Sequence, residues 1–217
     1  MSYFLDSNVL IGYVFRNADI WGDPANVVVE DEEENNSSTV VWSECFGSSE
    51  GGRCNTIQKK ISREFRRAIA KLNSGLSDEQ LLMFARDENW RIWSILKSIF
   101  DEYKGYSSVL LIKLIRDVQR RYDKDYIDRF NKLKETVTIH KRDKPYLEIR
   151  NLLEEFIDDW DDIQIILDAH YVGSLSKNII LITGDYNHIV PNKELICTHT
   201  SLLDVKGLGD YRAKTAI

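Results

Sequence analysis

The chain has 217 residues, 43% of them hydrophobic, which is enough to bury one sizeable core. It contains no apolar run near the roughly 20 residues that a transmembrane helix needs, and its first residues lack the pattern of a signal peptide. We therefore expect a cytoplasmic protein without a membrane partner. Its three cysteines, Cys45, Cys54 and Cys197, show no C-x-x-C spacing and cannot pair evenly, which favours structural thiols over a disulfide frame or a zinc ribbon.

The net charge of −6 is unevenly distributed along the chain. Residues 53–144 carry 22 Lys+Arg and 13 Asp+Glu, a net of +9, which leaves 7 basic and 22 acidic residues elsewhere, a net of −15. A basic middle between acidic ends is the pattern expected of a phosphate-binding surface beside a metal site. Ordinary solvated helix faces are the alternative interpretation.

The first predicted element is a short buried strand at 3–5, followed by a turn at 6–8 and an amphipathic helix from Val9. Residues 30–38 are acidic and polar, so we expect a solvated loop there. Residues 39–42 are predicted to form a second strand that leads to Glu44. The Gly- and Ser-rich stretch 47–52 has the composition of a mobile linker.

Residues 53–135 are predicted to be a mainly helical, basic insertion within a single domain that spans residues 1–217. Between Ile57 and Leu72, apolar side chains fall on one arc at about 100° per residue and basic side chains fall on the other. Further helical patterns cover 81–84, 90–100 and 109–133, with breaks at Gly75 and Gly105. The candidates for phosphate contacts on the polar side of the first helix are Arg63, Arg66 and Arg67.

The last third of the chain alternates between strand and helix patterns. Strands are predicted at 136–139, 179–182 and 195–197, and helices at 147–156 and from Asp161 onward. Strands separated by helices indicate an α/β fold with a parallel sheet.

Three predicted strands each lead to an acidic residue, namely Asp6, Glu44 and Asp185. In open α/β sheets the ligand crevice lies beyond the carboxyl ends of the strands, so we expect these acids to converge. Two unit charges about 4 Å apart repel by about 4 kcal/mol at an effective dielectric of 20, so clustered carboxylates require protons or cations. Mg²⁺ and Mn²⁺ are the simplest cations for such oxygen ligands.

A fourth acid is expected from the segment 158–168. Asp161 and Asp162 both fall at the N-terminus of the predicted helix, where they face the strand ends, whereas Asp168 lies about two turns further along. We select Asp162 as the site residue. The alternative is that Asp161 and Asp162 serve only as helix caps.

Two segments of the chain resemble a known family. Residues 5–11, Leu-Asp-Ser-Asn-Val-Leu-Ile, resemble the opening motif of PIN-domain nucleases, which include the VapC-like ribonucleases. Asp162-x-x-Ile165-x-x-x-Ala169 and the later run 180–187, Ile-Leu-Ile-Thr-Gly-Asp-Tyr-Asn, are similar to that family's helix acid and to its strand ending in Thr-x-Asp. The resemblance covers residues 1–48 and 136–204 and implies a three-layer fold with a central parallel sheet flanked by helices. Typical members lack so long a basic insertion.

The resemblance also implies a site and an activity. It places the metal-site acids at Asp6, Glu44, Asp162 and Asp185 and supporting residues at Asn8, Thr183, Asp168 and Asn187, with Glu50 and Glu64 as alternatives to Glu44. The implied reaction is hydrolysis of RNA phosphodiester bonds with Mg²⁺ or Mn²⁺. RNA is then the expected partner of the basic insertion, and an antitoxin protein or a second copy of the chain are further expected partners.

Two other functions stay open at the level of the sequence. One is a catalytically silent RNA-binding or scaffolding protein of the same fold. The other is a haloacid-dehalogenase-like phosphatase, but Asn8 stands where such an enzyme needs a proton-transferring Asp. The four histidines show no paired ligand spacing, and no Ser, Cys or Lys nucleophile motif is present. His188, three residues after Asp185, is near enough in sequence to touch the site.

Overall fold

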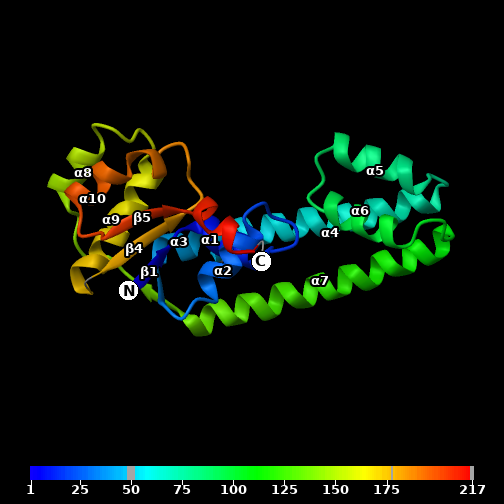
Figure 1. Cartoon of the computed structure of the whole chain (residues 1–217), viewed down its shortest axis with the longest axis horizontal. Coiled ribbons are helices and arrows are strands. Elements are labelled where there is room, and N and C mark those ends of the chain that lie inside the picture. The colour runs from blue at the N-terminus through cyan, green and yellow to red at the C-terminus, as the bar shows by residue number, and fades with distance from the viewer. Residues whose placement is uncertain (48–51, 177, 216–217) are drawn as a thin grey trace.

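A computed structural model describes residues 1–47, 52–176 and 178–215. In these residues five parallel strands form one sheet, in the order β3-β2-β1-β4-β5 (Figure 1). The strands are β1 (Ser2–Leu5), β2 (Glu34–Ser38), β3 (Val137–His140), β4 (Ile179–Thr183) and β5 (Asp204–Gly207). The predicted α/β class with a parallel sheet is therefore confirmed.

Helices cover both faces of the sheet and give the fold three layers. On one face, after β1 and β2, lie α1 (Ser7–Val14), α2 (Gly22–Val29) and α3 (Thr39–Phe46). On the other lie α8 (Leu147–Leu153), α9 (Trp160–Leu175) and α10 (Lys193–His199), because right-handed crossovers place helices on opposite faces when the strand order reverses. Two short 3₁₀ helices, η1 (Val190–Asn192) and η2 (Leu208–Thr215), complete the C-terminal part. Strand β4 is buried at every position and β1 from Tyr3 to Leu5, as expected of a sheet covered on both faces.

The second strand differs from the prediction, because β2 forms from the polar stretch that we expected to be a loop. Its side chains are buried yet bonded to neighbouring main chain: Asn36 Nδ2 donates to the Tyr3 carbonyl at 3.3 Å, and Ser37 Oγ donates to the Leu5 carbonyl at 2.9 Å. Ser38 then accepts from the Val41 N–H at 3.2 Å and caps α3. The predicted strand at 39–42 is therefore wrong, because this cap begins a helix there.

The other elements follow the sequence more closely. The strands expected at 3–5, 136–139 and 179–182 are confirmed as β1, β3 and β4, and the helix expected from Asp161 is α9. The strand expected at 195–197 is wrong, because those residues lie in α10 and the last strand is β5. Most of the predicted linker at 47–52 lies outside the described residues.

The basic middle of the chain forms four helices that extend from the sheet as a helical arm (Figure 1). The arm consists of α4 (Gly52–Asn73), α5 (Asp78–Asp87), α6 (Trp93–Glu102) and α7 (Ser108–Thr136). Gly75 and Gly105 adopt φ angles of 92° and 83° between these helices, so the predicted breaks occupy left-handed turns that favour glycine. The end of α7 returns to the sheet layers, where Arg129 Nη1 donates to Asn26 Oδ1 at 2.9 Å and Lys132 pairs with Glu30.

A buried ion pair ties the chain after β3 to α9. Arg142 Nε donates to Asp168 Oδ1 at 2.6 Å, and its Nη2 donates to Gln164 Oε1 at 2.5 Å. The Asp168 side chain is only 2% exposed, and its second oxygen has no other hydrogen-bond partner among the described residues. Asp168 is therefore held by an arginine inside the fold.

We expect Arg142→Met to lower the free energy of unfolding by about 3 kcal/mol, because it leaves a buried carboxylate without its cation. Urea denaturation would measure the loss. Lys141→Met, at the exposed neighbouring position, is the matched control and should change stability by less than about 0.5 kcal/mol. The double variant Arg142→Met/Asp168→Leu should recover much of the loss. An Arg142→Met protein as stable as the wild type would contradict this assignment.

Candidate metal centre

The candidate site lies at the carboxyl ends of β1 and β4, where the strand order of the sheet reverses. In α/β sheets this is the position at which two loops separate and leave a crevice. Asp6 directly follows β1 and caps α1, and its N–H donates to the Ile182 carbonyl at 3.1 Å. Thr183 is the last residue of β4. The main chain of the two strands therefore fixes the two sides of the site.

The carboxylate of Asp6 is buried and held by three donors. Its Oδ2 accepts from Thr183 Oγ1 at 2.7 Å and from Asn8 Nδ2 at 3.1 Å, and its Oδ1 accepts from the Ser7 N–H. Burial raises the pKa of Asp6, and these three hydrogen bonds oppose the rise because they favour the charged form. Asn8 and Thr183 thus support Asp6 directly, in the positions that the sequence motif assigned to them.

Asp185 is positioned by the turn that follows β4. Thr183 Oγ1 accepts from the Asp185 N–H at 3.0 Å, so one hydroxyl connects Asp185 to Asp6. Asp185 Oδ1 accepts from the N–H groups of Asn187 and His188, both at 2.7 Å, which leaves Oδ2 to face the site. Asn187 therefore contributes through its main chain.

The turn after β4 also packs tightly on α1. A Cβ atom at Gly184 would lie 3.0 Å from Asn8 Cβ and 3.2 Å from Trp21 Nε1, closer than nearly all real contacts. Glycine at this position lets the turn that carries Asp185 approach the helix that Asp6 caps.

Asp162, in the first turn of α9, is hydrogen-bonded to the side chain of His188. Asp162 Oδ2 lies 2.8 Å from His188 Nδ1, and Asp185 Oδ2 lies 3.8 Å from the same nitrogen. Burial and the charge of Asp185 raise the pKa of Asp162 to about 6, although the bond to His188 acts in the opposite direction. The same hydrogen bond to Asp162 raises the pKa of His188. Asp162 and Asp185 thus repel each other across a shared imidazole.

Asp159 adds a further carboxylate to this side of the site. It caps α9 by accepting from the Asp161 N–H at 2.9 Å and from the Asp162 N–H at 3.4 Å. One ligand atom each from Asp159, Asp162 and His188 lie within 4.8 Å of one another, an arrangement that can hold a metal ion. Asp161, the alternative to Asp162, is exposed on the helix and forms no part of this group.

Glu44 reaches the site from α3 and is already paired with a cation. Its Oε1 lies 2.6 Å from Arg53 Nη1, and the same nitrogen lies 3.5 Å from Ser7 Oγ. The negative charge of Glu44 contributes to the raised pKa of Asp6, so the two carboxylates interact electrostatically. Of the alternatives, Glu64 is buried inside the arm and accepts from the Ile92 N–H at 3.3 Å, while Glu50 lies outside the described residues.

The three arginines predicted for phosphate binding have different environments. Arg63 and Arg66 are exposed on α4. Arg67 is an ion-pair partner of Glu88 at 3.3 Å, and its guanidinium lies 5.0 Å from the centre of the Trp90 ring. It therefore helps to join α4 to the α5–α6 connection.

Two residues of the site were not predicted from the sequence. Asp159 directly precedes a helix pattern, which is the usual position of an N-cap, so the sequence did contain a signal for its place beside Asp162. Arg53 follows a Gly- and Ser-rich stretch, and no local pattern relates it to Glu44.

No family model, curated protein or solved structure matches this chain. Among the described helices, none combines the length and the apolar character needed to cross a bilayer.

The raised pKa values predict how stability changes with pH when no metal is bound. A carboxyl group whose pKa is higher in the folded state, as that of Asp162 is, binds its proton more tightly there, so stability increases as the pH falls through that pKa. In EDTA, lowering the pH from about 7.5 to about 5.5 should raise the melting temperature by about 2–4 °C, the shift for about 1 kcal/mol after allowance for solvent screening.

Melting of Asp162→Asn over the same pH range tests this expectation. The variant should melt higher than the wild type at about pH 7.5 and should lose most of the pH dependence, because one charge of the cluster is gone. Asp161→Asn is the matched control, since its carboxylate is exposed and one position away. Equal pH dependence in all three proteins would show that Asp162 and Asp185 do not repel in the folded chain.

Proposed function

We propose that this chain is a metal-dependent ribonuclease of the PIN type, which hydrolyses RNA phosphodiester bonds. The observation that carries the proposal is the carboxylate of Asp6, held by Thr183 and Asn8 at the junction of β1 and β4 beside two more carboxylates. Asp162 and Asp185 each repel a neighbouring negative charge, and a divalent cation relieves that repulsion. The donors are mainly carboxylate oxygens, the ligand type that Mg²⁺ and Mn²⁺ prefer.

Each residue of the cluster has a role in this proposal. Asp6, Asp162 and Asp185 supply the ligand oxygens, with Asp159 beside Asp162 as a further donor, and Asn8 and Thr183 orient Asp6. When bound, the metal supplies positive charge beside the scissile phosphate and a water of lowered pKa. His188 bonds to Asp162 and partly neutralises the cluster before a metal enters.

Glu44 has a separate role in the proposal because Arg53 already neutralises it. The pair lies beside Ser7, next to the Asp6 carboxylate, and is placed to orient a water or a phosphate oxygen. We therefore assign the second acid a positioning role.

The arm extends the proposal to the substrate. Arg63 and Arg66 are exposed on α4, whose first turn begins at the site with Arg53, so a strand of RNA that reaches the carboxylates also passes near a basic helix. An antitoxin partner and a homodimer stay predictions, since no contact in the described residues bears on them.

The direct test is Mn²⁺-dependent cleavage of RNA. Asp162→Asn and Asp6→Asn should each reduce cleavage by on the order of 100-fold, because each removes a charged ligand with little change of shape. Asp161→Asn should cleave at the wild-type rate, and Asp168→Asn should cleave normally at temperatures at which it stays folded.

The other functions give distinct results in the same assay. A silent RNA-binding protein would bind RNA but cleave none with Mn²⁺, and a phosphatase would consume p-nitrophenyl phosphate instead. EDTA is the control for metal dependence. Loss of activity in Asp168→Asn but not in Asp162→Asn would move the helix acid to the other position.

A second test concerns the basic face of α4. In Ca²⁺, chosen to support binding without turnover, the variant Arg63→Ala/Arg66→Ala should weaken binding of unrelated RNA sequences alike. The slope of log K against log salt should fall by about 0.7 for each lost phosphate contact. Arg86→Ala, on the exposed side of α5, is the control. Identical slopes would assign this face to something other than RNA.

A further inference from the structure

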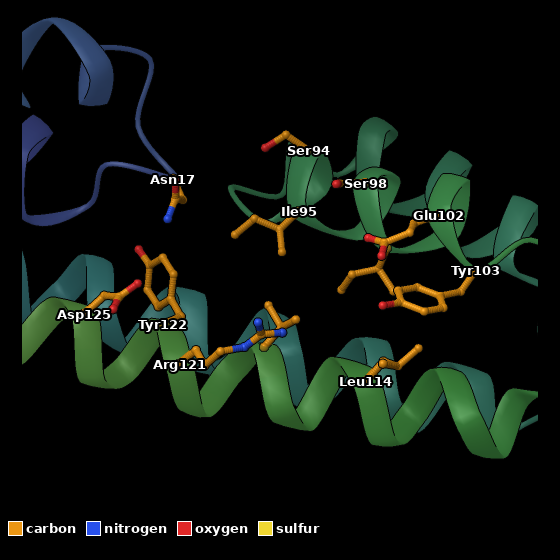
Figure 2. Close-up of a pocket in the computed structure, with 12 residues that line it drawn as sticks. Asn17, Ser94, Ile95, Ser98, Glu102, Tyr103, Leu114, Arg121, Tyr122 and Asp125 are labelled. Atoms are coloured by element: carbon orange, nitrogen blue, oxygen red, sulfur yellow. The ribbon is translucent and has the colours of Figure 1, made fainter.

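Two hollows adjoin each other, one beside the candidate site and one within the helical arm. The first has a volume of about 670 Å³ and lies between the α1–α2 connection and α4. The second has a volume of about 550 Å³ and lies between α6 and α7 (Figure 2). Asn17 and Ser94 line both, so the hollows meet at these two residues. Each volume is within the range of roughly 300–1,000 Å³ that ligand sites occupy.

The first hollow opens on the metal centre. Asn8 lines it and also donates a hydrogen bond to Asp6, so one side chain belongs to both the hollow and the carboxylate cluster. Arg53 and Lys60 line it from α4, two helical turns apart and on the same side of the helix. Lys60 forms no ion pair with any described residue. A ligand that extends from the carboxylates into this hollow therefore meets positive charge.

The first hollow also has exposed apolar walls. Ile20 is 76% exposed, and Trp21 and Trp90 line the same space. The Trp21 ring is stacked on Tyr186, at 5.5 Å between centroids, and the Arg212 guanidinium lies over the same ring at 4.5 Å, so these two contacts fix its plane. Cations beside fixed aromatic and aliphatic surfaces are the combination that binds the phosphates and the unstacked bases of single-stranded nucleic acid.

The second hollow continues the apolar and aromatic walls into the arm, where its charged lining residues are Arg121, Glu102 and Asp125. Figure 2 shows Ile95 and Leu114 on opposite walls, with Tyr103 near one end. Tyr122 is 6% exposed, and its hydroxyl has no hydrogen-bond partner among the described residues. In Figure 2 its ring rises from α7 with the hydroxyl directed toward Asn17, at the junction of the hollows. A buried hydroxyl without a partner costs about 1–3 kcal/mol, so a ligand with a polar edge is favoured at this point.

We propose that the two hollows form one track for single-stranded RNA that leads from the carboxylate cluster into the arm. The first hollow takes the nucleotide next to the scissile phosphate, with its phosphate at Arg53 and Lys60 and its base against the exposed Ile20 and the edge of Trp21. The second takes the following bases, one of which meets the Tyr122 hydroxyl. A duplex is excluded because its stacked bases cannot enter a hollow between two helices. This inference rests on the proposed function and adds the form in which the substrate is bound.

The experiment measures binding of fluorescein-labelled oligouridines of about 4 and about 12 nucleotides to the full chain in Ca²⁺, by anisotropy. The wild type should bind the longer RNA at least about tenfold more tightly. Ser94→Trp places an indole at the junction and should reduce the affinity for the longer RNA to that for the shorter one. Ser108→Trp, at an exposed serine of α7 outside both hollows, should leave both affinities unchanged.

A charge variant tests the first hollow by itself. Lys60→Ala should weaken the binding of both RNAs about threefold, since it removes one phosphate contact. Lys59 is exposed and lies outside the hollow, so Lys59→Ala should have little effect on either affinity. Circular dichroism and thermal melting confirm that each variant is folded.

Four results would overturn the track. The wild type could bind the two RNAs with equal affinity, or bind a duplex as tightly as a single strand of the same length. The Ser94→Trp variant could bind the longer RNA as tightly as the wild type does, or Lys59→Ala could weaken binding as much as Lys60→Ala. Because binding is measured without turnover, a protein that gives the expected pattern but cleaves no RNA with Mn²⁺ retains the track and loses the proposed activity. A protein that cleaves RNA without the expected pattern retains the activity and loses the track.

Discussion

Mutual repulsion of carboxylates at one edge of a parallel sheet is the constraint on which the rest of the site depends. Asp6 stays buried because Thr183, Asn8 and the Ser7 N–H donate to it, and two of these donors come from the turn and helix that it begins. Among the described residues Asp162 has no such set of donors, and it shares His188 with Asp185 instead. The chain thus stabilises Asp6 and Asp185 by hydrogen bonds, whereas Asp162 is held mainly by His188 and keeps a raised pKa.

The sequence predicted the parts of the site that follow a hydrophobic strand. Asp6 comes directly after β1, and Asp185 follows β4 after one intervening glycine; the apolar runs of both strands identify buried strands of a parallel sheet. Strand β2 could not be found in this way, because Asn36 and Ser37 are polar residues that become buried only by bonding to the main chain of β1. Its partners are distant in sequence, so a local pattern does not contain this information.

The arm shows a similar limit. Helical periodicity separated the apolar and basic sides of α4, but it did not distinguish Arg67, which lies against Trp90 and pairs with Glu88, from the exposed Arg66. The same periodicity gave no sign that Arg53 would pair with Glu44. Periodicity identifies the face of a helix, whereas the partner of each side chain depends on how the helices pack.

The position of the arm between β2 and β3 has a consequence for the order of folding. Asn35 pairs with Val137, 102 positions later, so this edge of the sheet closes a long loop. The helices of the arm contact one another locally, and near the end of α7 Arg129 donates to the Tyr13 carbonyl of α1 and to Asn26 of α2, while Lys132 pairs with Glu30 just after α2. Formation of the arm therefore brings the chain at β3 close to β2 and shortens the conformational search for this strand pairing.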